Sequence, residues 1–468
     1  MNERKNRRVF MGRQMLRAVL ERLKAQDRLR ECAVPVDPRF ELGAVLSAFN
    51  NEQPILFRNV KGSDLPVVGA VYGNRSIILD LLGTTTEKRL FKLMEAISLP
   101  SKPRLLERGP VQENVVTTGI DLLKMLPVPT SNERDAAPYL CASAFVVRDT
   151  ETGKIQMAVR RIQVLGGNKL YILVSGASPH LLGEIRRCAE RGRPLECAVV
   201  LGYDAPFLLA SQIGSGKYGL DKYEVDSTLR GEPLELVRCR TVDLEVPAWA
   251  EIVLEGKIEP GRAEPEGPFA ELMGYYSTVA PAPVMEVSAV THRNAPIFQH
   301  AFPCKEEHLA YGMIKEAEIF AALAHTVDVR DVNLTLGGGC RLHAVISIRK
   351  RAEGDGKSTI LGTLGAYKDI KHVVVVDDDV NIYNMAEVEA AVASRFQASR
   401  DLVVVSGALG SPLEASHMER GVSDKMGLDA TKPLGDKAAL YEAAVIPGFD
   451  KVKSSIDRYF SDGVDRRR

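Results

Sequence analysis

The segment Val284-Met-Glu-Val-Ser-Ala-Val-Thr291 is short and rich in β-branched residues, which is the composition of a β-strand. Similar runs recur between about residues 114 and 303, mostly bounded by Gly, Pro or Asp: residues 142–148, 170–174, 198–201, 234–240, 252–254 and 297–301. Apolar positions at helical spacing predict one helix within this region, at residues 179–191. The centre of the chain is therefore predicted to be a mostly β, barrel-like domain.

On both sides of this region, short apolar strands alternate with helical stretches, which is the pattern of α/β layers. Before it, helices are predicted at residues 41–50 and 86–98, and strands at 54–57 and 67–71. After it, a helix at 310–324 precedes strands at 331–335, 342–348 and 373–376. The last stretch, residues 440–468, is predicted to be a helix that packs on another domain or subunit. Three domains are expected: residues 1–112, 113–306 and 307–468.

Composition excludes several classes of protein. The 468 residues carry 61 basic and 61 acidic side chains, so no charge surplus favours nucleic-acid binding. No apolar run approaches the roughly 20 residues of a membrane span. The basic N-terminal 30 residues lack the apolar core of a signal peptide and are predicted to form an amphipathic surface helix. The seven cysteines contain no CxxC pair. A cytoplasmic protein with reduced thiols, and no membrane or nucleic-acid partner, is expected.

The segment Glu264-Pro-Glu-Gly-Pro-Phe-Ala-Glu271 combines carboxylates with residues that turn the chain. Its two prolines are incompatible with a regular helix, and its glycine permits an unusual backbone turn. A turn can bring Glu266 and Glu271 into one pocket, where two carboxylates of different proton affinity act as base and acid. An acidic surface turn is the alternative, and the segment taken alone favours it.

The segment Gln156-Met-Ala-Val-Arg-Arg-Ile-Gln-Val164 has the pattern of a strand with two adjacent arginines. In a strand, Val159 and Arg161 share one face and Arg160 points the other way. A guanidinium on an inward face suits bidentate binding of a carboxylate or phosphate. An exposed strand with paired charges is the more common outcome for such a pair.

Two other features are ambiguous when taken alone. Asp377-Asp-Asp-Val-Asn-Ile382 follows an apolar strand, where acids either bind a metal or cap the next helix, and the structural interpretation is favoured. His180 begins a predicted helix, and a single histidine acts as a ligand only with partners.

Taken together and in order, Arg161, the Glu266 and Glu271 pair, and Lys425-Met-Gly-Leu-Asp-Ala-Thr431 resemble the motifs of the UbiD decarboxylase family. The resemblance extends from about residue 15 to 431 through further segments: Val34-Pro-Val-Asp-Pro38, Asp135-Ala-Ala-Pro-Tyr139, Gly167-Asn-Lys-Leu170, Val246-Pro-Ala248, Ala250-Glu-Ile-Val-Leu-Glu-Gly256, Gly274-Tyr-Tyr276 and Asp377-Asp-Asp-Val-Asn381.

The resemblance implies an N-terminal α/β domain, a central split β-barrel related to flavin reductases, and a C-terminal α/β domain with a helical tail. It implies a carboxy-lyase that uses prenylated FMN, supplied by a separate flavin prenyltransferase. The reaction would be the reversible, non-oxidative decarboxylation of an aromatic, heteroaromatic or α,β-unsaturated carboxylic acid through a covalent adduct with the cofactor. Family members form dimers or hexamers, so a homo-oligomer is expected.

Site roles follow from the same resemblance. Arg161 would bind the substrate carboxylate and contact the flavin, Glu271 would donate the proton, and Glu266 would form an ion-pair network with Arg161. The cofactor would be lined by Gln156, Val159, Arg160 and Arg161, with His180 and Lys425 near its phosphate. Candidate substrate-pocket positions lie within residues 334–343 and 382–384.

The chain departs from the family pattern where the cofactor phosphate is bridged by a divalent metal, usually manganese, together with potassium. The metal ligands of the family are an asparagine, a histidine and a glutamate, and they fall here on Gln156, His180 and Lys222. One hypothesis is that the Lys222 ammonium replaces the metal as counter-charge. The other is a register shift that makes Glu224 the ligand and keeps the metal. Both stay open.

Two other functions are also open. In the first, the chain is a structural or catalytic subunit of a heteromeric aromatic carboxylase. A purely structural subunit, however, has no need of Arg161, Glu266 and Glu271. An FMN-dependent reductase ranks last, because reductase chemistry gives no reason for the two glutamates.

Overall fold

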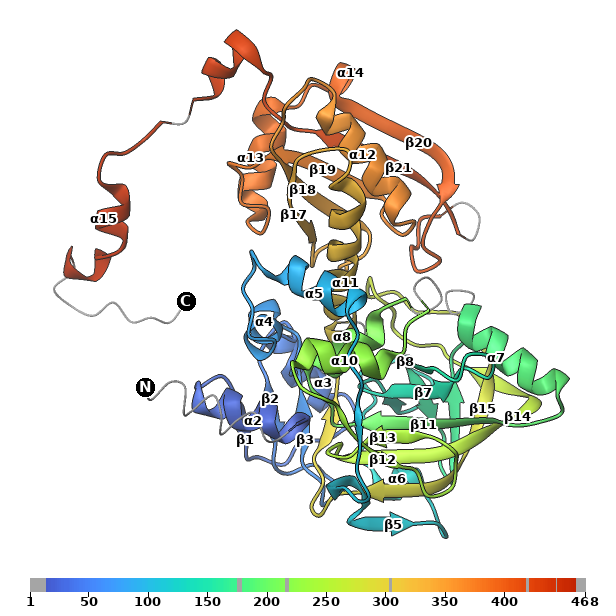
Figure 1. Cartoon of the computed structure of the whole chain (residues 1–468). Coiled ribbons are helices and arrows are strands. Elements are labelled where there is room, and N and C mark those ends of the chain that lie inside the picture. The colour runs from blue at the N-terminus through green and yellow to red at the C-terminus, as the bar shows by residue number, and fades with distance from the viewer. Residues whose placement is uncertain are drawn as a thin grey trace.

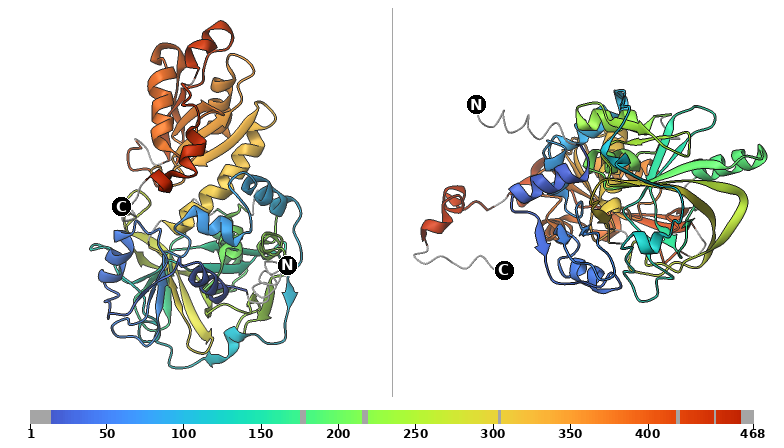
Figure 2. Two further views of the ribbon diagram at one scale, coloured as in Figure 1. Left: turned by 90° about the vertical axis from the view of Figure 1, so that its left-hand side faces the viewer. Right: turned by 90° about the horizontal axis from the view of Figure 1, so that it is seen from below.

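The structure is a computed structural model and describes residues 14–174, 179–214, 219–302, 305–417, 421–442 and 444–459. Its described centre is a nine-stranded sheet that curls on itself (Figures 1 and 2), as the β-branched runs predict. The strand order is β6-β9-β10-β15-β14-β11-β7-β8, with β5 also paired to β15, so the barrel is split and not closed. The strands are β5 (Asn114–Val116), β6 (Tyr139–Leu140), β7 (Ala144–Arg148), β8 (Ile155–Val159), β9 (Ile162–Val164), β10 (Lys169–Ile172), β11 (Leu195–Leu201), β14 (Ile252–Glu266) and β15 (Ala280–His292).

The N-terminal domain is built on a small sheet of order β1-β2-β3-β16. Its last strand comes from beyond the barrel, and Phe298 of β16 pairs in parallel with Val67 of β3. The strand at 297–301, which the sequence pattern groups with the central β region, thus completes the N-terminal sheet. The elements are α2 (Leu16–Ala25), β1 (Arg30–Cys32), α3 (Glu41–Ala48), β2 (Ile55–Phe57), β3 (Val67–Gly69), α4 (Arg75–Leu81), α5 (Arg89–Ser98) and β16 (Phe298–His300).

Helices join the barrel to its neighbours. The N-terminal helices α2, α4 and α5 share one hydrophobic core with α8 and α10 of the central domain and with the first half of the long helix α11. The amphipathic helix expected near the N-terminus is α2, which buries Leu16, Val19, Leu20 and Leu23. The remaining central elements are β4 (Arg104–Leu105), η1 (Pro110–Gln112), α6 (Leu122–Met125), α7 (Pro179–Glu190), α8 (Ala205–Gln212), α10 (Lys222–Arg230), β12 (Glu235–Arg238) and β13 (Glu245–Pro247).

The C-terminal domain is a five-stranded sheet of order β17-β18-β19-β21-β20 with helices on both faces. Alternating residues of β18 and β19 face α11 and α12 on one side and α13 on the other, which gives two separate cores. The elements are α11 (Glu306–Leu323), β17 (Val329–Leu334), β18 (His343–Ile348), α12 (Asp355–Ala366), β19 (His372–Asp377), α13 (Met385–Arg395), α14 (Ala398–Asp401), β20 (Leu402–Leu409) and β21 (Val422–Asp429).

The prediction of one helix over residues 440–468 is wrong in the described part of this stretch. Short pieces replace it: η2 (Gly435–Tyr441), α15 (Phe449–Lys453) and η3 (Ile456–Tyr459), while residues 460–468 lie outside the described residues. The break comes at Pro447 and Gly448, and Gly448 has a φ of 80°. This tail extends away from the body of the chain (Figures 1 and 2) and exposes apolar side chains such as Leu440 and Val445.

The structure also describes the cysteines, the longest helices and the acids at the end of β19. Six of the seven cysteines are free thiols, and Cys304 lies outside the described residues. In the described ranges, no helix combines the length and the apolar character that crossing a membrane requires. The acids at the end of β19 are structural, since Asp377 and Asp379 pair with Arg395 and Asp377 also accepts the backbone N–H of Lys432.

A buried ion-pair network fastens the N-terminal domain to the C-terminal domain. Glu316 of α11 is fully buried and pairs with Arg75 of α4 at 2.6 Å and with Arg89 of α5 at 3.3 Å. Arg89 also pairs with Asp331 of β17 at 2.7 Å. Both guanidinium groups lie over the ring of Tyr383.

Replacing Glu316 with Gln is expected to lower the free energy of unfolding by about 3–5 kcal/mol, because two buried guanidinium groups lose their shared carboxylate. Chemical denaturation of the purified variant measures this change. The control is Glu31→Gln, which removes an exposed carboxylate that pairs with Lys24 and Arg58 and should cost less than about 1 kcal/mol. Equal effects of the two substitutions would contradict the importance of the buried network.

Candidate active site

Two chain corners bring Arg161, Glu266 and Glu271 together. Strand β8 ends at Val159 and β9 begins at Ile162, so Arg161 lies at the bend between them. Glu266 is the last residue of β14, and a loop that begins at Gly267, with a φ of 92°, returns the chain to Glu271. Arg161 Nη2 donates to Glu266 Oε2 at 2.8 Å, and Arg161 Nη1 donates to Glu271. The structure therefore has the turn that brings Glu266 and Glu271 together, and not an acidic surface turn.

Neighbouring polar groups fix the loop that carries the two glutamates. Gln163 Oε1 accepts the backbone N–H of Gly267 at 3.0 Å and the hydroxyl of Tyr139 at 3.1 Å. On the other side, Asp135 Oδ1 accepts the backbone N–H of Ala270 at 3.0 Å. The loop is therefore held from the barrel and from the segment before β6.

Ser277 and Phe269 also hold the Arg161 side chain in place. Ser277 Oγ accepts from Arg161 Nη2 at 3.3 Å and from the backbone N–H of Phe269 at 3.2 Å. The ring of Phe269 lies 4.8 Å from the Arg161 guanidinium carbon, within the range of a cation–π contact. These contacts leave the guanidinium one orientation, with its two terminal nitrogens toward the two glutamates.

Charge at this site is unevenly buried. The side chain of Glu266 is fully buried, that of Arg161 is 9% exposed and that of Glu271 is 18% exposed. Burial lowers the pKa of Arg161, but the carboxylates of Glu271 and Glu266 outweigh it and raise the pKa above its ordinary value. Burial and the nearby Glu266 raise the pKa of Tyr139. One permanent cation thus faces two carboxylates.

A cavity of about 180 Å³ lies between the central domain and the C-terminal domain, with this site on its wall. The central domain contributes Val159, Arg160, Arg161, Phe269 and Glu271, among others. The prediction that Arg160 and Arg161 point to opposite faces of one strand is wrong, because the strand breaks between Val159 and Ile162 and both arginines line the cavity.

The opposite wall comes from the C-terminal domain and was only partly predicted. Arg341, within the expected segment 334–343, lies 4.2 Å over the Tyr311 ring and pairs with Asp369 at 2.5 Å. Burial and the Arg341 charge hold the pKa of His308 well below its ordinary value. His308 and Tyr311 were not predicted, because only the packing of α11 against the barrel brings them to a site so distant in sequence.

Two other predicted positions lie away from this cavity. Tyr383, within the expected segment 382–384, lies over Arg75 and Arg89 at the domain junction. Lys425 of β21 donates to the carbonyl of Lys368 at 2.6 Å, beside the Asp369 that pairs with Arg341. Lys425 is therefore close to the residues that hold Arg341 in the C-terminal wall of the cavity. Its contact with a cofactor phosphate stays a prediction.

The residues at the expected metal positions have other partners in this structure. Gln156 Nε2 donates to the carbonyl of Leu220 at 3.2 Å, and its buried Oε1 has no hydrogen-bond partner among the described residues. His180 Nε2 is 2.7 Å from Asp149 Oδ2. Lys222 and Glu224 lie two positions apart at the start of α10, about 200° around the helix, so their side chains leave opposite faces. Lys222 is buried, while the turn at Glu224 contacts Ser101.

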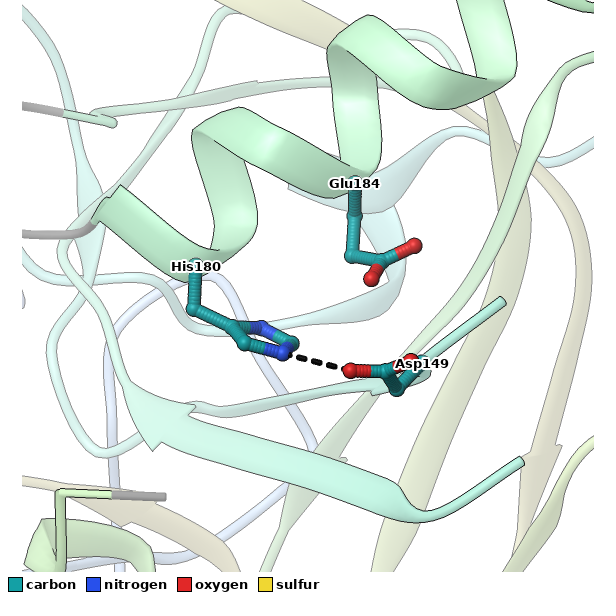
Figure 3. A group of neighbouring side chains, drawn as sticks. All are labelled: Asp149, His180 and Glu184. Atoms are coloured by element: carbon teal, nitrogen blue, oxygen red, sulfur yellow. Dashed lines mark hydrogen bonds and ion pairs between the residues drawn. The ribbon is translucent and has the colours of Figure 1, made fainter. Parts of the chain in front are cut away.

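A different group, Asp149 with His180 and Glu184 of α7, has ligand atoms within 4.8 Å of one another (Figure 3). These groups already have partners. Glu184 pairs with Arg187 and accepts from Thr150, and Asp149 Oδ1 accepts from two backbone N–H groups of its own turn. The arrangement is that of a structural hydrogen-bond network. No metal site is derived from it.

Lys222 has an unusual environment for a lysine. Its Nζ donates to the carbonyls of Met157 at 2.6 Å and Ser211 at 2.9 Å, and none of the described carboxylates forms an ion pair with it. Burial, together with the positive charges of Arg160 and Lys315, lowers the pKa of Lys222 to about 7. This lysine lies behind the cavity wall, since Arg160 and the neighbour of Ser211, Gln212, line the cavity.

A split β-barrel between two α/β domains, with an arginine and one of its two glutamate partners on the wall of an interdomain cavity, is the arrangement of a UbiD-type carboxy-lyase. The three domain families of 3-octaprenyl-4-hydroxybenzoate carboxy-lyase match this chain: the N-terminal domain over residues 20–97, the Rift-related domain over 104–306 and the C-terminal domain over 308–430. The chain belongs to the UbiD family, and its predicted fold class and carboxy-lyase activity are confirmed.

Similar proteins cover nearly the whole chain. The anhydromevalonate phosphate decarboxylase of Methanosarcina mazei is 36% identical over 435 residues, 92% of this chain and 99% of that protein. The phenolic acid decarboxylase of Bacillus subtilis is 30% identical over 450 residues, 91% and 93% respectively. The structure of the UbiD-class enzyme HmfF from Pelotomaculum thermopropionicum in complex with FMN has a TM-score of 0.91 and 43% identity, covering 94% of this chain and 99% of that one. An evolved dimeric form of HmfF in complex with prFMN has a TM-score of 0.87.

Proposed function

We propose that this chain decarboxylates an aromatic, heteroaromatic or α,β-unsaturated carboxylic acid with prenylated FMN bound in the interdomain cavity. The observation that carries the proposal is the placement of Arg161 between Glu266 and Glu271 on the cavity wall. The HmfF structures, which hold FMN and prFMN, support the same cofactor here. The bound cofactor supplies the electron sink that no side chain provides.

The exposures of the two glutamates divide their roles. Glu271 is partly exposed and lines the cavity, so it reaches the substrate carbon and delivers the proton that replaces carbon dioxide. Glu266 is fully buried and acts as a fixed counter-charge that orients Arg161. Arg161 binds the leaving carboxylate through its planar guanidinium. Gln156, Val159 and Arg160 would contact the cofactor, and the cavity lining formed by Val159 and Arg160 supports this role for those two residues.

The cellular setting proposed is a cytoplasmic enzyme that receives its cofactor from a flavin prenyltransferase and assembles as a homo-oligomer. The tail exposes apolar side chains, Leu440, Val445 and Ile446 among them. These residues support assembly, because their burial by a second chain lowers the free energy of the assembly. The evolved dimeric form of HmfF adds support for oligomers in this family.

Purification after co-expression with a flavin prenyltransferase tests the proposed function. The expected result is a protein that absorbs in the near-ultraviolet and visible range and releases carbon dioxide from at least one member of a panel of aromatic and heteroaromatic acids. A colourless protein would favour the alternative of a subunit of a carboxylase complex. Oxidation of NADH without carbon dioxide release would favour the FMN reductase.

Substrate binding is expected to take up a proton at neutral pH. The substrate carboxylate adds a third negative charge beside Glu266 and Glu271, and a nearby like charge raises the pKa of a carboxyl group, so Glu271 is expected to gain a proton on binding. Calorimetry in buffers of different ionisation enthalpy, using FMN-loaded protein that cannot turn over, measures an uptake of up to about one proton. Glu264→Gln, on an exposed residue of the same segment, should keep the uptake, and Glu271→Gln should lose it. Proton release on binding would contradict the role of Glu271.

A further inference from the structure

Lys222 is a buried lysine whose immediate hydrogen-bond partners among the described residues are neutral. Only 5% of the residue is exposed, and its ammonium donates to two backbone carbonyls. A buried charge is costly unless an opposite charge accompanies it. Among the described residues, no carboxylate takes that place, so the arrangement is suited to an anion that comes from outside the chain.

The side chains around Lys222 increase this preference for an anion. Arg160 and Lys315 are close enough for their charges to act on Lys222. Lys315 pairs with Glu318 at 2.9 Å and lies over the rings of Tyr311 and Tyr367, of which Tyr311 lines the cavity. Three cationic side chains from the barrel, α10 and α11 therefore gather beside the proposed cofactor cavity.

The same surroundings are unsuited to a divalent metal. Manganese in a protein prefers carboxylate, carbonyl and water oxygens, and a metal that bridges a phosphate needs an anionic ligand from the protein. Here Gln156 offers one neutral oxygen, His180 is hydrogen-bonded to Asp149, and a lysine occupies the third position. Glu224, the alternative ligand, leaves α10 on the face opposite to Lys222.

We propose that Lys222 replaces the divalent metal of the family as the counter-charge of the cofactor phosphate, so that this chain binds its flavin at a metal-free phosphate site. Arg160 and Lys315 reinforce the positive potential, and Gln156 supplies a neutral hydrogen-bonding neighbour. The inference rests on the proposed function, since it takes the flavin phosphate as the anion.

Flavin binding by the purified full-length protein, expressed without a prenyltransferase, tests this inference independently of catalysis. The probes are FMN and riboflavin, which differ only in the phosphate, and binding is followed by flavin fluorescence. The wild-type protein should bind FMN equally well in a chelator and in added Mn²⁺, and metal analysis should find far less than one manganese per chain. Stoichiometric manganese, or a tenfold loss of FMN affinity in chelator, would overturn the proposal.

Substitution of the lysine provides the second arm. Lys222→Met should weaken FMN binding by about 30-fold or more, as expected for the loss of one member of a buried charge pair, and leave riboflavin binding within about twofold. Lys257→Met, which removes an exposed lysine paired with Glu196, is the matched control and should bind both flavins normally. Equal weakening of FMN and riboflavin binding in a folded Lys222→Met protein would overturn the proposal. If that variant does not fold, the chelator and manganese measurements on the wild type still decide.

A third variant tests whether charge at position 222 selects between metal and ammonium. Lys222→Glu combined with Gln156→Asn recreates the family's ligand set, and FMN binding should then require Mn²⁺. FMN affinity equal to wild type without Mn²⁺ would overturn the proposal. Failure of the proposed function is a separate outcome: a protein with Lys222-dependent FMN binding that decarboxylates no acid would refute the function alone, whereas a manganese-dependent decarboxylase would refute this inference alone.

Discussion

Glu271→Gln is expected to lower kcat by about 10²–10⁴-fold while the cofactor still binds, because removal of a positioned general acid costs this much. The amide keeps the size of the side chain and its contact with Arg161 but has no acidic proton to deliver. Glu271 is the only one of the two site glutamates that lines the described cavity. Carbon dioxide release under substrate saturation measures the change, and the cofactor absorbance checks that the site stays loaded.

Glu264→Gln is the matched control for this prediction. Glu264 lies in the same segment, on the exposed part of β14, and its substitution should leave kcat within about twofold. A Glu271→Gln variant that turns over as fast as this control would mean that the proton comes from another group.

Arg161→Lys is expected to lower kcat/KM by roughly 30- to 5,000-fold, which corresponds to about 2–5 kcal/mol for the loss of a buried hydrogen-bonded charge partner. A compact ammonium cannot span both glutamates and still bind a carboxylate in the bidentate manner of a guanidinium. Much of the loss should be in KM, because the substrate carboxylate loses its ligand. Initial rates over a range of substrate concentrations separate KM from kcat.

The control for the arginine is Arg262→Lys. Arg262 pairs with Glu286 on the partly exposed surface of the β14–β15 hairpin, away from the cavity lining, and its substitution should leave both constants unchanged. An Arg161→Lys enzyme with wild-type KM would contradict the assignment of Arg161 as the carboxylate ligand.

The order of the motifs predicted the fold and the central triad of the site. The β-branched runs gave the barrel strands, and the turn formers around Gly267 correctly indicated a loop that joins Glu266 to Glu271. Spacing could not predict the corner at Arg160, because the alternation rule holds only while a strand continues, and this strand ends at Val159. The sequence therefore assigned the two arginines to opposite faces, although both line the cavity.

Contacts between segments that are distant in the chain could not be predicted from the sequence. His308 and Tyr311 reach the cavity only because α11 packs against α8, and β16 joins the N-terminal sheet after the whole barrel has been traversed. That Lys222 lies on the buried face of α10, opposite to Glu224, also needed the structure, because local composition does not reveal which face of a helix is buried. The tail was predicted as one helix, and Pro447 with Gly448 was an available signal against it.

The most direct test of the account is solvent-deuterium labelling by the cofactor-loaded wild-type enzyme. In D₂O, the account predicts one deuterium in the product, at the carbon that carried the carboxylate, with carbon dioxide released in equal amount. It also predicts that Glu271→Gln, assayed in parallel, gives almost no labelled product. Labelled product formed equally fast by Glu271→Gln, or a wild-type enzyme that holds prenylated FMN and neither releases carbon dioxide nor incorporates deuterium with any acid of the panel, would contradict it.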